Sequence, residues 1–173
     1  MKHNYLIKTH RLDLRQVEKN DLYSLLLWRN DDNIRKWFFD NKTITLKKQY
    51  LWYEKYLQND TDIMFIIDEK SELETAIGSV ALYNLNTQKK QAEFGRLMIG
   101  NKNAMGKGFG LECTSAVCDF GFNNLNLNKI YLEVYERNTR AIKIYEQAGF
   151  TAKETYIKDN EQTIFMTLER ENF

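Results

Sequence analysis

The stretch that decides the fold is Met105-Gly106-Lys107-Gly108-Phe109-Gly110, which stands between a predicted strand at 92–99 and a predicted helix at 108–123. Glycine adopts positive φ angles and lets the backbone approach a ligand closely. The helix that follows offers unpaired N–H groups and the positive end of its dipole. Together these features predict a pyrophosphate site, with the charge of Lys107 nearby. A flexible connector is the alternative, since the stretch matches neither the P-loop pattern nor the Rossmann fingerprint.

A second informative stretch begins at Asn138, a natural N-cap for a helix predicted over 139–148. Ala141, Tyr145 and Ala148 follow at spacings of four and three, which places them on one face of that helix. The small residues let another group pack closely, with the Tyr145 hydroxyl at the centre of the face. A core tyrosine on an amphipathic helix is the alternative interpretation of the same pattern.

The remaining periodicity predicts a mixed α/β domain whose centre is a strand–turn–helix–strand unit. Strands are expected at 9–15, 62–68, 77–85, 92–99, 129–135, 152–158 and 163–169. Helices are expected after Asn20 or Asp21 with Leu22, Leu25 and Leu26 on one face, and at about 45–58, 108–123 and 139–148. The helix that Thr45 caps has an expected inner stripe of Leu46, Tyr50, Tyr53 and Leu57. An even composition without a linker predicts a single domain over 1–173.

The composition excludes several classes of protein. Hydrophobic residues make up 43% of the 173 residues and charged residues 28%, as in an ordinary globular domain. A net charge of +1 argues against a strongly basic nucleic-acid-binding protein. No stretch approaches the roughly 20 apolar residues that span a bilayer, and the N-terminus lacks the apolar core of a signal peptide. A cytoplasmic protein is therefore expected, with no membrane or nucleic-acid partner.

The two cysteines and two histidines are too few for most structural zinc sites, so no metal is expected. Cys113 and Cys118 are five positions apart on the helix predicted at 108–123 and therefore point in different directions. Both are expected to be reduced packing residues with no disulfide between them.

The two stretches together resemble the GNAT superfamily of acetyl-CoA-dependent N-acetyltransferases. In that superfamily Q/R-x-x-G-x-G/A is followed further along by N-x-x-A-x-x-x-Y-x-x-x-G-F. The second pattern is matched at Asn138, Ala141, Tyr145, Gly149 and Phe150, and the first at Gly108 and Gly110, with Met105 in place of Gln or Arg. This departure should matter little, because backbone N–H groups make most of the phosphate contacts. The likeness extends to 9–15, 92–95 and 131–134, and so covers nearly the whole chain.

The resemblance implies a GNAT fold, an α/β single domain whose central mixed, twisted sheet is splayed between its fourth and fifth strands and flanked by helices. Acetyl-CoA would lie in the splay as co-substrate, with its pantetheine arm along the fourth strand and its pyrophosphate on the turn at 105–110. Gly95 suits a bulge that drives the splay. Contacts with acetyl-CoA are expected from Leu97, Met98, Ile99, Met105, Gly106, Lys107, Gly108, Phe109, Gly110, Asn138, Ala141 and Tyr145.

The implied reaction is direct attack of a primary amine on the acetyl thioester in a ternary complex, which gains rate from proximity. Tyr145 is the predicted general acid for the leaving thiolate, and a backbone N–H near 94–97 would polarise the carbonyl oxygen. Glu93 is the predicted base, directly or through a water, with an exposed strand carboxylate as the alternative interpretation and Glu133 in reserve. Neither cysteine falls on a matched catalytic position, so no acetyl-cysteine intermediate is expected.

The amine acceptor is expected against residues 28–39, because the N-terminal segment builds the acceptor pocket in this superfamily. Its Trp-Arg-Asn and Ile-Arg-Lys-Trp-Phe runs look like the amino-sugar-nucleotide N-acetyltransferases of pseudaminic acid synthesis. Aromatic rings can stack on a base or a sugar, and cationic side chains can meet a diphosphate. The predicted acceptor-binding residues are therefore Trp28, Arg29, Asn30, Arg35, Trp37 and Phe38. The alternative is that the two tryptophans are core residues and the cations lie on the surface.

Other branches of the superfamily remain alternatives for the acceptor. The segments at 9–15 and 92–95 look like enzymes that acetylate the N-termini of ribosomal proteins, and 92–95 also resembles spermidine acetyltransferases. Asp31, Asp32 and Asp40 could supply carboxylates for a polyamine, although the cations at 35–36 weigh against a cationic acceptor. A protein that binds acetyl-CoA as a sensor without turnover is a further alternative. The assembly is left open, with a homodimer as one candidate.

Overall fold

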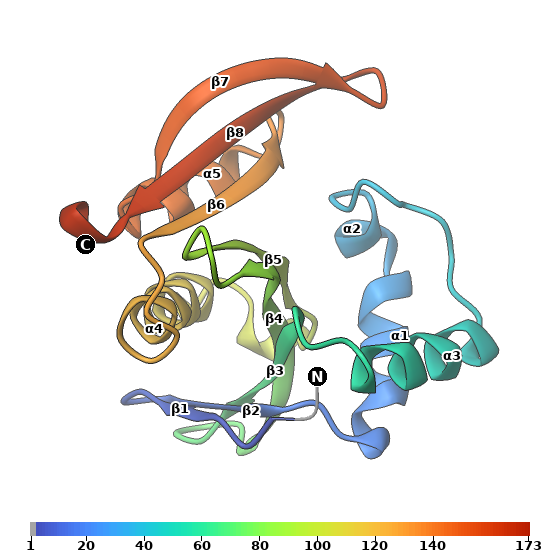
Figure 1. Ribbon diagram of the computed structural model, residues 1–173. Helices are drawn as coiled ribbons and strands as arrows, with labels where there is room; N and C mark the ends of the chain where they lie inside the picture. Colours follow the sequence, from blue (N-terminus) through green and yellow to red (C-terminus); the bar gives the residue numbers. More distant parts are fainter. Residues whose placement is uncertain (1–2) are drawn as a thin grey trace.

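Eight strands form one mixed sheet in the computed structural model, which describes residues 3–173 (Figure 1). They are β1 (Leu6–Lys8), β2 (Leu12–Gln16), β3 (Ile63–Glu69), β4 (Thr75–Asn86), β5 (Gln91–Ile99), β6 (Lys129–Tyr135), β7 (Thr151–Lys158) and β8 (Glu161–Glu169). Their order is β1-β2-β3-β4-β5-β6-β8-β7. Every neighbouring pair is antiparallel except β5 and β6, which are parallel. The expected mixed α/β fold is confirmed.

The helices of residues 3–173 cover both faces of this sheet (Figure 1). On one face lie α1 (Leu22–Asn30), α2 (Asp32–Arg35) and α3 (Leu46–Leu57), and on the other lie α4 (Phe109–Asn123) and α5 (Thr139–Gln147). Short 3₁₀ turns occur at Lys19–Asp21, Lys102–Ala104 and Arg170–Asn172. Within residues 3–173, no helix has both the length and the apolar character needed to cross a bilayer.

The inner strand β3 is buried on both faces of the sheet. Phe65 and Ile67 belong to the core beneath α4, whereas Met64 and Ile66 belong to a second core with α1 and α3. A strand with an unbroken apolar run is typical of a position that is buried on both sides.

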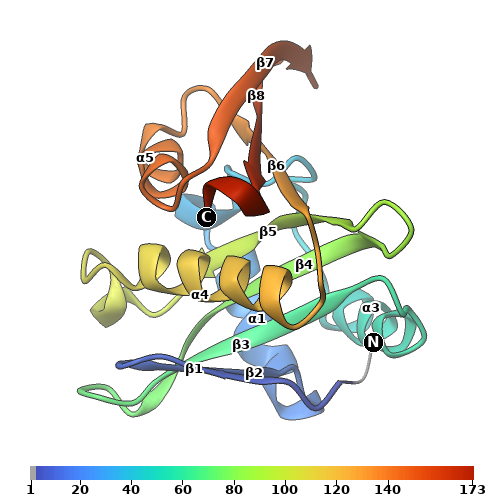
Figure 2. The ribbon, with the colours of Figure 1, turned by 60° about the vertical axis from the view of Figure 1, so that its left-hand side comes forward.

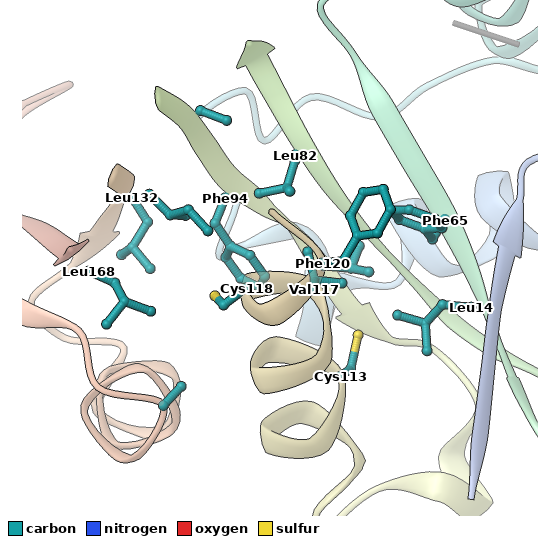
Figure 3. Packing of buried hydrophobic residues seen from close by; sticks show 14 of the residues in the cluster. Leu14, Phe65, Leu82, Phe94, Cys113, Val117, Cys118, Phe120, Leu132 and Leu168 are labelled. Atoms are coloured by element: carbon teal, nitrogen blue, oxygen red, sulfur yellow. The ribbon is translucent and has the colours of Figure 1, made fainter. Parts of the chain in front are cut away.

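The inner face of α4 supplies much of the first core. Figure 3 shows Cys113, Val117 and Phe120 directed toward the sheet, among side chains such as Leu14 and Phe65 from the strands. Cys113 and Cys118 are both buried and unbridged, and burial raises the pKa of each thiol above its ordinary value. The cysteines are packing residues, as the sequence predicts.

The sheet opens between β5 and β6, which are the fourth and fifth strands of the sequence-based prediction. The two strands pair only where 91–93 lie beside 129–131. Beyond that point β6 leaves β5 and runs along β8 (Figure 2). The second half of β5 therefore has a strand partner on one side only, where it pairs with β4.

A one-residue bulge lies in β5 next to this opening. Opposite 79–81 of β4, β5 has one extra residue between Gly95 and Met98. The bulge follows Gly95, where one was expected, and its left-handed conformation falls on Arg96, with a φ of +52°. Gly95 has a different role, because a Cβ there would lie 2.8 Å from the Tyr83 hydroxyl oxygen, so only glycine leaves room for that ring.

The start of the chain differs from the prediction in two short elements. β1 has three residues and α2 has four, which is too short for a periodic pattern to be recognised. The strand expected from residue 9 begins at Leu12, because the Thr9 N–H donates to the Leu12 carbonyl oxygen (2.9 Å) and closes a turn.

Helix α3 has the predicted ends but a different buried face. Thr45 caps it by accepting a hydrogen bond from the Lys48 N–H (3.3 Å). The prediction of an inner stripe was wrong for three residues that are exposed, namely Leu46, Tyr50 and Leu57. The inner face consists of Gln49, Trp52, Tyr53 and Tyr56. The helix is therefore rotated about its axis relative to the prediction. In this orientation the Trp52 and Tyr56 rings stack with their centroids 5.3 Å apart.

Candidate active site

An open cavity of about 650 Å³ lies where β5 and β6 diverge. The turn before α4, the second half of β5, the end of β6, one face of α5 and residues 33–39 form its walls. The predicted site residues that line it are Trp37, Phe38, Leu97, Met98, Ile99, Met105, Gly106, Gly108, Phe109, Gly110, Asn138, Ala141 and Tyr145, together with Glu133. Those that do not line it are Trp28, Arg29, Asn30, Arg35, Glu93 and Lys107.

One end of the cavity is a cradle of backbone N–H groups, which we call the amide cradle (residues 106–110). Gly106 and Gly108 have φ angles of +78° and +82°, and Gly108 is the N-cap of α4. Within residues 3–173, none of the five amides from 106 to 110 has a hydrogen-bond acceptor. A Cβ on Gly106 would meet no atom within 4 Å, so the space in front of the cradle is open. Such a group of amides at a helix N-terminus fits a phosphate or pyrophosphate.

The amide cradle is held from behind by Arg11. Its guanidinium donates to the Lys107 carbonyl oxygen (3.0 Å) and pairs with Glu112 of α4 (2.6 Å). The same guanidinium lies 4.5 Å from the centroid of the Phe109 ring. These contacts join the turn before β2 to the first turn of α4, so the cradle keeps its shape without a ligand.

The cationic side chains near the cavity are not the ones that the sequence suggested. Lys107 points away and pairs with Glu72 of the β3–β4 turn. Arg140 and Lys143 of α5 line the cavity instead. The sequence contained a signal for these two residues. They are three positions apart on the same helix as Tyr145, so their side chains are neighbours on the helix surface.

The free edge of β5 forms a second wall. Leu97, Met98 and Ile99 line the cavity, and their strand is paired with β4 but not with β6 at this level. Backbone groups that would bond to the next strand in a closed sheet are therefore available to an extended ligand. This geometry suits the pantetheine arm that the resemblance implies.

Tyr145 lies between these two walls. Its ring packs edge-on against Phe94, with centroids 5.9 Å apart, and lies 6.0 Å from that of Phe150. Its hydroxyl has no hydrogen-bond partner within residues 3–173, and burial raises its pKa above the ordinary value. The phenol is therefore protonated near neutral pH and has a proton to donate into the cavity. Asn138 caps the helix by accepting from the Ala141 N–H (3.4 Å).

Glu93 sits behind the cavity wall. Its two carboxylate oxygens accept hydrogen bonds from the Tyr83 hydroxyl (2.6 Å) and from the Asn84 amide (2.8 Å). Both donors are neutral, and Glu93 forms no ion pair within residues 3–173. Tyr83 lines the cavity, and burial followed by the bond to Glu93 raises its pKa above the ordinary value. Sequence reasoning missed Tyr83, which stands between the carboxylate and the cavity.

The bulge residue Arg96 also lines the cavity. One guanidinium nitrogen lies 2.8 Å from each oxygen of the buried Asp62 carboxylate. The guanidinium is 4.5 Å from the centroid of the Tyr83 ring. These two partners hold Arg96 in its left-handed conformation, which otherwise costs about 1–3 kcal/mol.

Aromatic residues of the 33–39 segment close the other end of the cavity. Trp37 and Phe38 line it as predicted, and Phe39 lines it as well. The segment meets the C-terminal half of the chain, because Phe39 packs edge-on against Tyr135 (4.8 Å) and the Arg137 guanidinium lies over Trp37 (4.9 Å).

The other predicted acceptor residues are engaged inside their own segment. Asn30 bonds to both the N–H and the carbonyl oxygen of Ile44 (2.8 Å each). Arg29 stacks on Phe38 (4.1 Å), and Arg35 donates to the Asn41 carbonyl oxygen (2.7 Å). These polar side chains shape the loop and do not face the cavity, so a diphosphate does not meet them there.

Two further groups in this segment also have local partners. A Cβ on Gly100 would overlap the Trp28 ring, so Trp28 packs against β5 and belongs with the core, as the alternative interpretation held. Asp31 caps α2, and Asp32 pairs with Arg35. None of Asp31, Asp32 and Asp40 lines the cavity, whereas Glu133 does.

Comparisons with known proteins agree with this geometry. The family model described as "Acetyltransferase (GNAT) domain" matches residues 11–151. The spermidine N(1)-acetyltransferase of Vibrio cholerae is 30% identical over 140 residues, which cover 81% of this chain and 79% of that protein. A crystal structure of the Vibrio cholerae spermidine N-acetyltransferase with CoA and spermine has a TM-score of 0.87 at 25% identity, over 95% of this chain and 98% of that one. The acetyltransferase PseH of Campylobacter jejuni is 25% identical over 136 residues, which cover 79% and 80% of the two chains.

Proposed function

The chain belongs to the GNAT acetyltransferase family and is an N-acetyltransferase, and from that premise we propose that it acetylates a primary amine of a polyamine with acetyl-CoA as donor. The observation that supports a polyamine as acceptor is the charge of the side chains on the acceptor side of the cavity. Within residues 3–173 Glu93 bonds only to neutral donors and stands behind Tyr83, which lines the cavity, whereas Glu133 lines the cavity but pairs with Lys158. A carboxylate without a cationic partner favours a cationic ligand.

The relatives support the same acceptor. Two spermidine acetyltransferases are similar to this chain over about four-fifths of its length, at 30% and 28% identity. The similarity to PseH is weaker, at 25% identity. The physical motive for an amino-sugar nucleotide was a set of cations at Arg29, Arg35 and Lys36 beside stacking aromatics. Both arginines are engaged within their loop, and the Lys36 ammonium lies 5.2 Å from the centroid of the Trp37 ring and does not line the cavity. The polyamine, the alternative in the sequence analysis, is therefore preferred.

The donor half of the proposal rests on the amide cradle and the free edge of β5. The five amides of residues 106–110, which have no acceptor within residues 3–173, suit the pyrophosphate of CoA. Arg140 and Lys143 add positive charge to the same cavity. Asn138 and Ala141 keep the first turn of α5 against the cavity, so that Tyr145 projects toward the reacting end.

The side chains then have distinct roles in proton transfer. A polyamine amine is protonated at neutral pH, with an ordinary pKa of about 10.4, and must lose a proton before attack. Glu93 receives this proton through the Tyr83 hydroxyl, which bonds to it and lines the cavity. Tyr145, whose hydroxyl is protonated and has no partner within residues 3–173, donates a proton to the thiolate that leaves. A backbone N–H at the β5 bulge polarises the carbonyl oxygen.

Release of free thiol from acetyl-CoA tests this proposal directly. Spermidine, spermine, an amino-sugar nucleotide and an N-terminal peptide are compared as acceptors under the same conditions. We expect kcat/KM for spermidine to exceed that for the other two classes by about tenfold or more, which corresponds to about 1.4 kcal/mol in the barrier. Faster turnover of the sugar nucleotide or the peptide would reject the polyamine. CoA binding without thiol release from any amine would favour a sensor.

A further inference from the structure

Glu133, at the end of β6, is surrounded by groups that bind cations. Its carboxylate accepts a hydrogen bond from the Tyr156 hydroxyl and pairs with the Lys158 ammonium, both from β7. The same ammonium lies 4.1 Å from the centroid of the Phe39 ring. A carboxylate and an aromatic face around one ammonium form a cation cage, here made of Phe39, Glu133 and Tyr156 and filled by Lys158.

The cage belongs to the acceptor end of the cavity. Glu133 and Phe39 both line the cavity, beside Trp37 and Tyr83. Its aromatic wall is held in place, because Phe39 packs on Tyr135 and the Arg137 guanidinium covers Trp37 of the same segment. A ligand that extends from the reacting centre toward residues 33–39 therefore passes the cage.

The lysine that fills the cage is held weakly. The side chain of Lys158 is 38% exposed and that of Glu133 is 21% exposed. Ion pairs at this level of exposure contribute little to stability, because water screens the charges and two long side chains must be ordered. Lys158 is also the last residue of β7, an edge strand that pairs only with β8, and it precedes the turn at 159–160. Moving its side chain toward solvent requires no change in the core.

We propose that this cage is the subsite for the second, non-reacting ammonium of the acceptor, and that Lys158 is a tethered competitor that this ammonium displaces. The inference rests on the proposed polyamine function. An acceptor with one positive charge has nothing to place in the cage, whereas a diamine or polyamine exchanges its own ammonium for that of Lys158. The pair of Glu133 and Lys158 would thus determine selectivity between singly and multiply charged amines.

Binding measured by calorimetry tests the exchange without relying on turnover. Spermidine and propylamine are titrated into the CoA-saturated full chain, as wild type and as Lys158→Met, Lys158→Arg, Glu133→Gln and the Lys158→Met/Glu133→Gln double variant. Lys153→Met is the matched control, because Lys153 is an exposed lysine on the same strand.

We expect Lys158→Met to tighten spermidine binding about three- to fivefold, the range of a weak surface ion pair, while propylamine is unaffected. Lys158→Arg should restore wild-type affinity. Glu133→Gln should weaken spermidine binding and abolish the gain from Lys158→Met.

Three results would overturn the cage. They are unchanged or weaker spermidine binding in Lys158→Met, an equal gain in Lys153→Met, and no spermidine binding to any variant. Thiol release distinguishes failure of the cage hypothesis from failure of the proposed function. If spermidine is acetylated but Lys158→Met does not change its affinity, the cage is rejected and the polyamine function stands. If Lys158→Met binds spermidine more tightly but spermidine is not acetylated, the polyamine reaction is rejected and the cage stands.

Discussion

The donor and acceptor ends of the cavity are built in different ways. At the donor end, the amide cradle uses the backbone of one continuous segment, 106–110, and is completed by one helix, α5. At the acceptor end, side chains from β4, β5, β6, β7 and the 33–39 segment meet, and most of them bond to another side chain first. The donor end could be identified from its motif, whereas the acceptor end could be identified only after folding.

The difference also predicts how each end responds to mutation. A backbone cradle depends on conformation, so a change at one glycine should remove most of its function. In a network of side chains several contacts contribute to ligand binding, so a single substitution there should reduce binding or activity only in part. The four predictions below test this contrast, from the largest expected effect to the smallest.

Gly108→Val should raise the Kd for CoA by more than about 100-fold, because charge-assisted hydrogen bonds contribute about 1.5–3 kcal/mol each and more than one is lost. A β-branched residue is also strained at the φ of +82° found there. Calorimetry with CoA gives the affinity, and circular dichroism checks the fold. Gly108→Ala is the milder variant if the valine lowers Tm too far. Wild-type affinity in a folded Gly108→Val protein would contradict the amide cradle.

Tyr145→Phe should lower kcat about 10- to 1000-fold with little change in the KM for acetyl-CoA, as general-acid effects do. Steady-state kinetics measure kcat and KM, and rapid-mixing pre-steady-state kinetics distinguish the chemical step from product release. Because burial raises the pKa of Tyr145, its phenol stays protonated where an ordinary tyrosine ionises, so loss of this acid should begin only above about pH 10.

The matched control for this change is Tyr23→Phe, which alters a 62% exposed phenol on α1. It should leave kcat unchanged. Equal turnover by the wild type and Tyr145→Phe, with chemistry limiting, would assign Tyr145 to core packing.

Trp37→Ala should raise the KM for spermidine about 2- to 30-fold at unchanged KM for acetyl-CoA, since a cation–π contact contributes about 0.5–2 kcal/mol. Trp37 lines the acceptor end and does not touch the amide cradle. Trp28→Phe is the comparison, because Trp28 packs on Gly100 and should change Tm more than KM. A larger effect of Trp37→Ala on acetyl-CoA than on spermidine would break the division into two ends.

Lys107→Ala should change the Kd for CoA by less than about threefold, the size expected for an exposed ion pair. The lysine lies next to Gly108 in sequence, but its ammonium pairs with Glu72 and it does not line the cavity. Titration of CoA at two ionic strengths measures the effect. Loss of affinity as large as that of Gly108→Val would mean that the side chain, and not the backbone, holds the phosphate.

Local patterns predicted several elements well. β6 was predicted residue for residue, α5 ends at a glycine with positive φ, and the β7–β8 hairpin turns at Asp159 and Asn160. Each depends on neighbours in sequence: strand alternation, an N-cap, or residues that tolerate left-handed conformations. The extent of the chain as one domain over 1–173, its cytoplasmic location and a homodimer remain predictions, which size measurements and fractionation can check.

Predictions that required knowing how a helix or side chain is oriented toward the rest of the fold were less successful. The inner face of α3 was placed on Leu46, Tyr50 and Leu57, because periodicity alone does not say which of two apolar stripes meets the sheet. The bulge was expected at Gly95 and lies next to it, but the sequence did not show which residue takes the positive φ. Arg96 takes it, since Asp62, 34 positions away in sequence, holds the guanidinium.

The sequence by itself determined the family and predicted the amide cradle, because glycine conformation, helix capping and unpaired amides are local properties of a short segment. Only the tertiary structure decided the acceptor end. Whether a charged side chain faces a ligand or another side chain depends on partners that the fold brings together, as with Glu93 and Tyr83 or Glu133 and Lys158. The sequence suggested free cations at Arg29 and Arg35, but both are engaged by their own loop, and that difference changed the preferred acceptor from an anion to a cation.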